Sequence, residues 1–239
     1  MSLIARKLMS VAKVGDPPPD PDLVLVFDTT LATGTTVTVP LAGAVDVVID
    51  WGDGNSEAFT TTGNKTHTYA SEGEYTVRVS GSLGGFGGFV TRPNLTKCLS
   101  FGDLGLFSLF RAFGDCANLV EVPKSVPSSV ANMNSMFFRA TSFNQNIGSW
   151  DMSNVTNTSG MLRGTPFNQN LGSWNMGSVT NMTSMFRDAP AMTFPLGSWQ
   201  TNLSSQPNAF SLNANATFQS FRGTADFPLL ADGVTRVNT

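Results

Sequence analysis

Residues 143–157 read FNQNIGSWDMSNVTN, and residues 167–181 repeat them almost unchanged as FNQNLGSWNMGSVTN. The same period continues on both sides of this pair, because two sets of apolar residues recur at intervals of 24 or 25. The first set is Leu95, Leu119, Phe143, Phe167 and Met192, and the second is Phe113, Phe137, Leu162, Phe186 and Phe210. Such self-similarity indicates a solenoid, whose stacked repeats share a core that no single repeat can form. A solenoid presents an extended surface, so the period predicts contact rather than chemistry.

The period also predicts the course of each repeat. We expect a strand to begin at each residue of the first set and a short helix, such as 132–138 or 181–186, to return on the opposite face. Methionines beside the second set are expected to fill the interior, and Trp150, Trp174 and Trp199 recur as partly buried rungs. Five clear repeats and an irregular sixth near 216–221 give a β/α solenoid, with a C-terminal cap over residues 222–239.

The composition excludes several classes of partner. Charged residues make up only 13% of the 239 residues, about half the globular average. A net charge of −3 with a pI near 5.0 offers no basic footprint for nucleic acid and little attraction to an anionic membrane. No run of about 20 apolar residues predicts a membrane span. Cys98 and Cys116 fall at different phases of the repeat, which favours two buried free thiols over a disulfide.

Residues 1–22 are predicted to be a docking segment followed by a stiff linker, the proline-rich DPPPDP of residues 16–21. Apolar residues at helical spacing form the candidate anchor, namely Leu3, Ile4, Leu8 and Val11. A helix this short is marginal alone, so we expect it to dock on another protein. Basic residues interrupt the apolar run, which makes the segment a poor secretion signal.

Residues 23–88 change to a strand pattern. Four runs rich in β-branched residues, bounded by turn residues, predict strands at 23–27, 35–39, 45–49 and 75–79. Several short strands separated by turns indicate a β-sandwich. The glycine-rich SGSLGGFGG of residues 80–88 could add an irregular strand leading into the solenoid.

Three pieces of this region resemble a polycystic-kidney-disease (PKD) type immunoglobulin-like domain. They are VIDWGDG at 48–54, HTY at 67–69 and GEYTV at 73–77, in the order that the family has them. Gly52 and Gly54 permit a tight turn with positive φ, and Asp53 can accept hydrogen bonds from nearby amides. Trp51 and Tyr69 are expected to pack at the end of the sandwich.

Residues 90–220 carry a second resemblance. AFGDCANLVEVP at 112–123 is similar to a BspA-like (Treponema-type) leucine-rich repeat, and the duplicated stretches resemble repeats of bacterial surface proteins in the same superfamily. Pro195 and residues 200–201 depart from the pattern. Together the resemblances imply two domains, an all-β immunoglobulin-like (PKD) sandwich at 23–88 and a β/α leucine-rich-repeat solenoid at 89–221.

Candidate chemistry is sparse. The single histidine, His67, is expected to be a strand residue with a hydrogen-bonded ring, and no Ser-His-Asp or Cys-His set can be assembled around it. Cys116 points to the core in the repeat pattern. Asp50 and Asp53, with Asp46, Asn55 or Glu57, could hold calcium, although the turn explains these residues without a metal. We therefore predict no enzyme, no catalytic residue and no cofactor.

Polar turns of the duplicated stretches form the candidate ligand-contact surface. Its members are Gln145, Asn146, Trp150, Gln169, Asn170 and Trp174. Two interpretations stay open: ladders that satisfy polar groups between stacked repeats, which we favour, and a glycan-binding face on which the tryptophans stack.

The function that follows is a non-enzymatic phage virion structural protein, either a capsid decoration or head fibre or a tail-associated adhesin. Its N-terminal segment would bind other virion proteins, and its solenoid would meet a host protein or glycan. Both modules resemble those of bacterial surface proteins and phage particles, residues 1–16 do not read as an export signal, and MSLIARKLM resembles the N-termini of some marine-phage structural proteins. The alternatives are a bacterial cell-surface adhesin and a polysaccharide-binding module of a glycan-degrading system. A homo-oligomer is left open.

Overall fold

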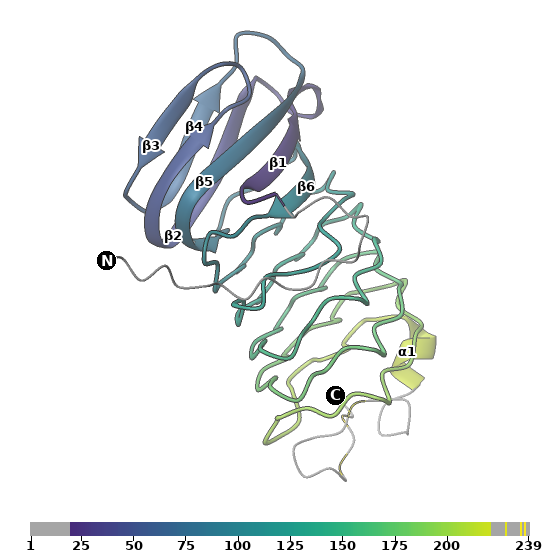
Figure 1. The fold of residues 1–239 in the computed structure, drawn as a ribbon. Helices are drawn as coiled ribbons and strands as arrows, with labels where there is room; N and C mark the ends of the chain where they lie inside the picture. The colour runs from purple at the N-terminus through teal and green to yellow at the C-terminus, as the bar shows by residue number, and fades with distance from the viewer. Residues whose placement is uncertain (1–19, 221–227, 229–234, 236, 238–239) are drawn as a thin grey trace, which may run out of the picture.

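The computed structural model describes residues 20–220 together with Pro228, Thr235 and Val237. The described chain is elongated, with an antiparallel sheet at one end and a stack of irregular turns continuing from it (Figure 1). Among the described residues the one α-helix is the short α1 (Ala216–Ser220), so this part of the chain is all-β. No described helix has the length and apolar character needed to cross a membrane. The predicted anchor residues Leu3, Ile4, Leu8 and Val11 lie outside the described residues, as does most of the predicted cap.

Six strands and one short 3-10 helix, η1 (Thr29–Leu31), build the sheet end of the molecule. The strands are β1 (Leu23–Asp28), β2 (Thr36–Asp50), β3 (Ser56–Phe59), β4 (Gly63–Thr68), β5 (Glu74–Phe86) and β6 (Leu95–Phe101). They form one connected antiparallel sheet in the order β3-β2-β5-β1-β6, and β4 pairs with the first part of β2. All five apolar residues of β1 are buried, as expected for a strand between two neighbours that is covered on both faces.

The predicted strands at 23–27 and 75–79 are confirmed, while those at 35–39 and 45–49 merge into the single strand β2. The register of β2 against β5 shifts between Ala42 and Val45, and such a bulge bends a strand. Gly43 lies in this bend at a φ of 70°, where a Cβ would come within 3.1 Å of the Gly84 Cα. The glycine-rich stretch after residue 79 belongs to β5 and pairs with β2 across the bend.

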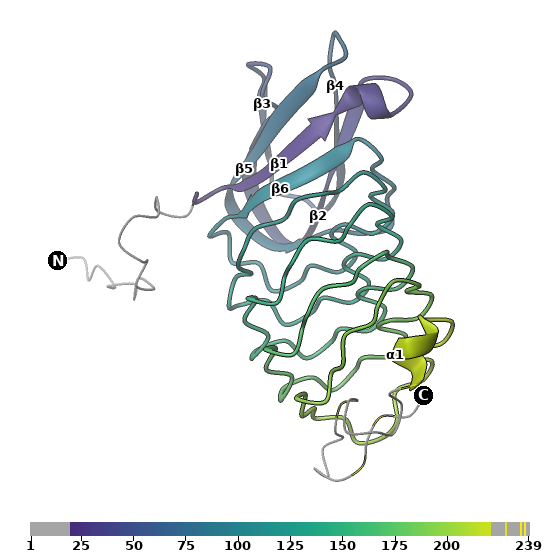
Figure 2. The same cartoon turned by 90° about the vertical axis from the view of Figure 1, so that its right-hand side faces the viewer.

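Beyond β6 the chain winds into the stack, and we call each winding of 24 or 25 residues a coil (Figure 2). Isolated parallel bridges mark the coils, running from Gly85 through Ser108, Asn132 and Asn157 to Asn181. Alternate amides donate to the next coil, as Phe113 N does to Met136 O at 2.8 Å and Phe137 N to Met161 O at 2.9 Å. The intervening amides close tight turns within their own coil, as Gly114 N does with Arg111 O at 3.1 Å.

The predicted helices at 132–138 and 181–186 are wrong, because those residues form turns rather than helices. Each coil carries two left-handed residues four positions apart, for example Ser135 and Arg139, or Gly160 and Gly164. A left-handed residue cannot continue a right-handed helix, and the amides that a helix would use are donated to the next coil instead. Of the strands predicted in the repeats, only the one at Leu95 forms, as β6.

The core positions that the period predicts are confirmed. Every residue of both apolar sets is buried, and so are Met136, Met161 and Met185. The core is one cluster that runs from the sheet into the coils, and the Phe86 and Phe113 rings meet across the predicted boundary at residues 88–89. β6 lies beyond that boundary and pairs with β1, so the sheet and the first coil share a strand.

The joint between sheet and coils also buries three reactive or charged groups. Cys98 and Cys116 are free and buried, as predicted, and burial raises the pKa of both thiols. The guanidinium of Arg92 is buried, lies 5.2 Å from the centre of the Phe86 ring and donates to Ala112 O at 2.5 Å. Burial lowers the pKa of Arg92, because a buried charge loses its hydration.

Candidate functional site

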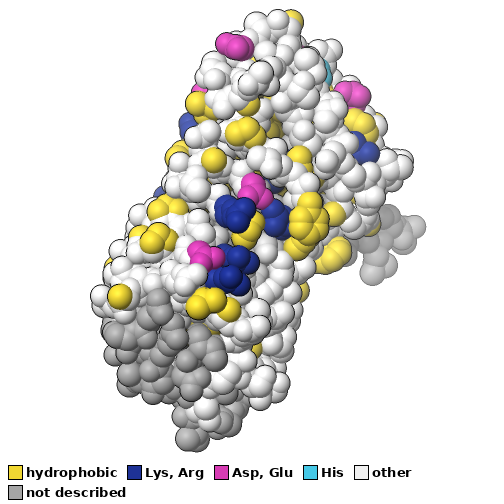
Figure 3. Space-filling model, turned by 180° about the vertical axis from the view of Figure 1, so that it is seen from behind, with side chains coloured by type: hydrophobic (Ala, Val, Ile, Leu, Met, Phe, Trp, Pro, Cys, Tyr) yellow, Lys and Arg dark blue, Asp and Glu magenta, His cyan; other side chains and the backbone are white. Residues whose placement is uncertain are grey.

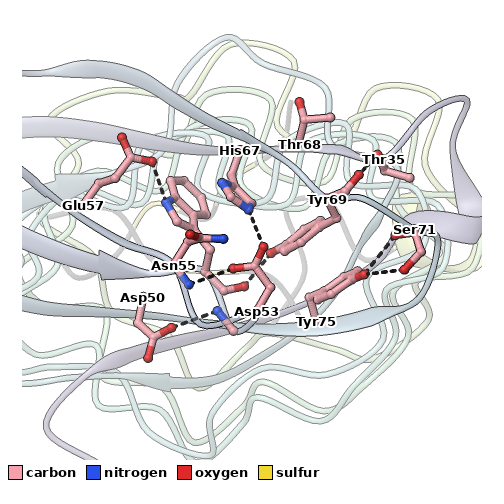
Figure 4. Close-up of polar contacts among 12 residues, drawn as sticks. Thr35, Asp50, Asp53, Asn55, Glu57, His67, Thr68, Tyr69, Ser71 and Tyr75 are labelled. Carbon is pink, nitrogen blue, oxygen red and sulfur yellow. Dashed lines mark hydrogen bonds and ion pairs between the residues drawn. The ribbon is translucent and has the colours of Figure 1, made fainter.

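The turn between β2 and β3 is held by its own side chains, as the sequence predicts (Figure 4). Asp50 Oδ1 accepts a hydrogen bond from Gly52 N at 2.9 Å, and Asp53 Oδ1 accepts one from Asn55 N at 3.0 Å. Gly52 has a φ of 80°, and a Cβ at this residue would lie only 2.4 Å from Thr76 O. Glycine is therefore required here by both conformation and space.

His67 closes the turn from the neighbouring strand β4. Its Nε2 lies 2.8 Å from Asp53 Oδ2, and its ring stacks on Trp51 with centroids 5.0 Å apart and planes at 11°. The hydrogen bond from His67 is the largest cause that lowers the pKa of Asp53. The prediction that His67 is a strand residue with a hydrogen-bonded ring is confirmed.

Two tyrosines complete this aromatic cluster. Tyr69 Oη donates to Trp51 O at 2.7 Å, and the Tyr69 ring stacks on Tyr75 with centroids 3.5 Å apart. Burial raises the pKa of Tyr69 far above its ordinary value, so its hydroxyl stays protonated and keeps donating. Trp51 and Tyr69 are both buried, and together with His67 and Tyr75 they tie three separate pieces of chain into one cluster.

The carboxylates near this turn already accept hydrogen bonds from N–H groups of the protein itself. Asp50 and Asp53 accept backbone amides, and Glu57 Oε1 accepts the Trp51 Nε1 proton at 3.0 Å. Within residues 20–220 and the three described residues beyond them, no group of three or more His, Cys, Asp or Glu side chains is placed to share a metal ion. The arrangement braces the sheet, and the calcium alternative gains no support from it.

On the coils, the polar residues of the predicted contact surface mainly bond within the stack. Gln145 binds both the amide and the carbonyl of Val122, at 2.6 and 2.7 Å, and Gln169 donates to Asn144 Oδ1 at 3.2 Å. The side chains of Asn146 and Asn170 are exposed, and each accepts the amide two residues later in its own turn. The bonds of Asn144, Gln145 and Gln169 to neighbouring coils fit the predicted ladders, whereas Asn146 and Asn170 bond within their own turns.

The tryptophans of the predicted contact surface are not on the surface. Trp150 and Trp174 are only 2% and 3% exposed, and their Nε1 atoms donate to Pro123 O and Ile147 O at 2.9 and 3.0 Å. Trp199 is buried in the same way and donates to Leu171 O at 2.8 Å. Each indole finds its acceptor on the preceding coil, which satisfies its N–H inside the core. The rings are thus buried rungs, as the period predicts, and the alternative in which Trp150 and Trp174 face a ligand is wrong.

A group of arginines that the sequence analysis did not single out lies on one face of the coils (Figure 3). We call it the arginine cluster, and it consists of Arg111, Arg139, Arg163 and Arg187 with the half-buried ring of Phe138. The guanidinium carbons of Arg111, Arg139 and Arg163 lie 4.9, 5.0 and 5.4 Å from the centre of the Phe138 ring. The sequence holds a signal for this cluster, because Arg139, Arg163 and Arg187 are spaced 24 residues apart.

Two carboxylates partly neutralise the cluster. Arg111 pairs with Asp115, while Arg163 Nε and Arg187 Nε each lie 3.4 Å from Asp188 Oδ2. A hydrogen bond from Asn213 is the largest cause that lowers the pKa of Asp188, and Arg163 and Arg187 lower it further. Arg139 is exposed, and no carboxylate among the described residues pairs with it.

A shallow depression of about 300 Å³ adjoins the arginine cluster. Its wall includes Arg111, Phe138 and Arg163, and it also carries the hydroxyl-bearing residues Ser135, Ser159, Thr183 and Ser184. Charged forks, one aromatic ring and several hydroxyl groups therefore face the same hollow, which suits a polar and negatively charged ligand.

Comparison with known proteins finds a similarity for the coils alone. Residues 107–223 match the family model described as "Mycoplasma protein of unknown function, DUF285". No curated protein and no solved structure matches the chain. The matched stretch begins at residue 107, after β6 ends at Phe101, so the similarity covers the coils that follow β6 and leaves out the whole sheet.

Proposed function

We propose that the protein is a non-enzymatic contact protein in which the sheet mounts the stack of coils and the coils meet an extended partner. Repetition is the observation that carries this proposal. Parallel bridges and alternate amide bonds place equivalent positions of successive coils side by side, 24 or 25 residues apart. A surface built this way repeats along one axis and stays rigid, which suits a partner that is itself extended.

The finer fold assignment belongs to the same proposal. In this assignment the sheet is a PKD-type immunoglobulin-like module, and the coils are BspA-like repeats in which turns replace the helices. The cluster of Trp51, Asp53, His67 and Tyr69 supports the first part, because it joins two of the three pieces that carry the resemblance, and Tyr69 stacks on Tyr75 of the third. The family match over residues 107–223 supports the second part.

The setting that we propose is a phage virion, where the protein would be a capsid decoration or head fibre or a tail-associated adhesin. The alternative setting is the bacterial cell surface. The resemblance of both modules to proteins of surfaces and particles supports either setting.

Fractionation tests the proposed setting. Mass spectrometry of purified particles, of the host cell surface and of the host cytoplasm should find the protein at fixed stoichiometry in particles. A purely cytoplasmic protein would overturn the proposal, and enrichment on the cell surface would replace the virion with the alternative. Incubating the purified chain with host polysaccharides tests the non-enzymatic part, because any depolymerisation would contradict it.

A further inference from the structure

We propose that the arginine cluster binds a linear acidic polysaccharide, one that carries carboxylates or sulfates, laid along the stacking direction of the coils. This inference rests on the proposed function, because it names the chemical class of the extended partner. It concerns the face that carries Phe138, not the turns at residues 144–150 and 168–174 that the sequence analysis singled out.

The charge of the cluster is the first argument. Four guanidinium groups stand against the two carboxylates paired with them, which leaves an excess of two positive charges on a chain whose net charge is −3. Arg139 has no carboxylate partner among the described residues, and the single carboxylate of Asp188 is shared by two arginines. Unused guanidinium donors in a fixed fork are the groups that bind carboxylates and sulfates in pairs of hydrogen bonds.

The spacing of the cluster is the second argument. Arg163 and Arg187 occupy equivalent positions on successive coils, and Arg139 lies one residue further along its own coil than they do on theirs. Chains paired in this way lie about 4.8 Å apart. The charges therefore form a row along the stack, and a polymer with regularly placed acidic groups can engage several of them at once.

Preorganisation is the third argument. Three guanidiniums lie 4.9–5.4 Å from the centre of the Phe138 ring, and that of Arg111 also lies 4.8 Å from the centre of the Phe89 ring. Cation–π packing holds the forks in place before a ligand arrives, which lowers the entropy lost on binding. The Phe89 ring is 81% exposed, and it offers the apolar face of a sugar ring a surface to pack on.

The neighbouring hollow is the fourth argument. Ser135 and Ser184 occupy equivalent positions of their coils in the wall of the depression, and their hydroxyls can both donate to and accept from sugar hydroxyls. A nucleic acid fits this face less well, because only Phe89 is exposed among the rings that the arginines contact, whereas a single strand stacks its bases on successive rings.

Binding of the full chain to defined polymers tests the inference. Titration calorimetry at about 0.15 M salt, where weak surface charge is screened, would use alginate and dextran sulfate as acidic probes and neutral dextran as the uncharged control. The double variant Arg139→Gln/Arg163→Gln should weaken binding of the acidic probes at least tenfold. The control Lys65→Gln/Lys124→Gln removes the same charge elsewhere on the chain and should change the affinity less than twofold. Neutral dextran should not bind.

Several outcomes would overturn the inference. They are no binding of either acidic probe, an equal loss in both double variants, and tighter binding of single-stranded DNA or of anionic phospholipid vesicles than of alginate. If the double variant fails to fold, the single variant Arg139→Gln replaces it, because that side chain is exposed and holds no ion pair among the described residues. Failure here leaves the proposed function standing, since that is decided by where the protein is found.

Discussion

The sheet and the coils satisfy their backbone in different ways. In the sheet, neighbouring strands pair along their length, as β1 does with β5 over Leu23–Asp28. In the coils only alternate amides reach the next coil, and side chains take up carbonyls that strand pairing would otherwise use. In the coils, polar and indole side chains therefore make hydrogen bonds to backbone carbonyls that backbone amides make in the sheet. Equivalent substitutions should be more damaging in the coils, and the following predictions measure that difference.

The largest expected effect concerns the aromatic column inside the coils. Phe137 is fully buried, and its ring lies 5.6 Å from Phe113 and 4.0 Å from Phe143 between centroids. Phe137→Ala should lower the free energy of unfolding by about 3–5 kcal/mol, because it removes buried surface and leaves a cavity. Urea denaturation followed by tryptophan fluorescence measures the loss. Val120→Ala, at an exposed position, should stay within about 0.5 kcal/mol. A loss below about 1 kcal/mol for Phe137→Ala would show that the coils repack.

A matched pair of tryptophans compares the two regions directly. Trp174→Phe removes one of the two donors to the carbonyl of Ile147 and leaves it the amide of Trp150, so the lost bond should cost about 0.5–1.5 kcal/mol beyond the change in ring size. Trp51→Phe in the sheet frees only the carboxylate of Glu57, which is exposed and can bind water instead. The difference between the two free energies of unfolding isolates the bond to the preceding coil. Equal losses would contradict the structural role given to the indoles of the coils.

Replacing alanine by glycine should change the stability in opposite directions in the two regions, because the coils contain left-handed residues. Ala209 lies in a coil at a φ of 51°, so Ala209→Gly should raise stability by up to about 1 kcal/mol by relieving backbone strain. Ala58 lies in β3, where Ala58→Gly should lower stability by about 0.5–1 kcal/mol through the entropy of the unfolded chain. Thermal unfolding of both variants measures the two signs. A loss at both positions would mean that Ala209 is not strained.

The smallest effect is the acid sensitivity of the sheet. The pKa of Asp53 is lowered chiefly by the hydrogen bond from His67, and that of Asp20 chiefly by the hydrogen bond from Arg78. A carboxyl whose pKa is lowered on folding stabilises the folded state at any pH above its ordinary pKa of 3.8. This contribution is lost as the pH falls through the pKa of the folded state. Urea midpoints should therefore decline below about pH 4. Asp53→Asn should lower the urea midpoint at pH 7 and make the midpoint fall less steeply below about pH 4. If the midpoint of the variant falls as steeply as that of the original chain, Asp53 does not contribute to the acid sensitivity.

Much of the core was predictable from the sequence, because a hydrophobic period reports burial directly. Leu95, Phe143, Phe137 and Phe186 were all assigned to the interior by their spacing, and all are buried. The turn at residues 50–55 was predictable for a similar reason, since only glycine and short acceptor side chains build it.

The rest depended on contacts that spacing does not encode. Nothing local marks Ser135 or Arg139 as left-handed, because neither residue type prefers that conformation, and so helices were predicted where turns occur. The spacing of Trp150 and Trp174 predicted buried rungs, but it did not show that their indoles donate to carbonyls 27 residues earlier in the chain. The sequence shows the regular spacing of the arginines, but only the structure shows that three of them pack around the ring of Phe138.

Because each coil pairs with the next one, the number of coils sets the length of the stack. The bonds that seat a coil connect it chiefly to the windings next to it, as Leu162 N does with Met185 O. Removing or copying one complete unit, such as residues 144–167, would change the reach of the protein by one increment while both ends kept their neighbours. The near-identity of residues 143–157 and 167–181 is what such copying leaves behind. The length of the stack can thus change by whole coils, in evolution or by protein engineering, without any change in the sheet or in the last coil.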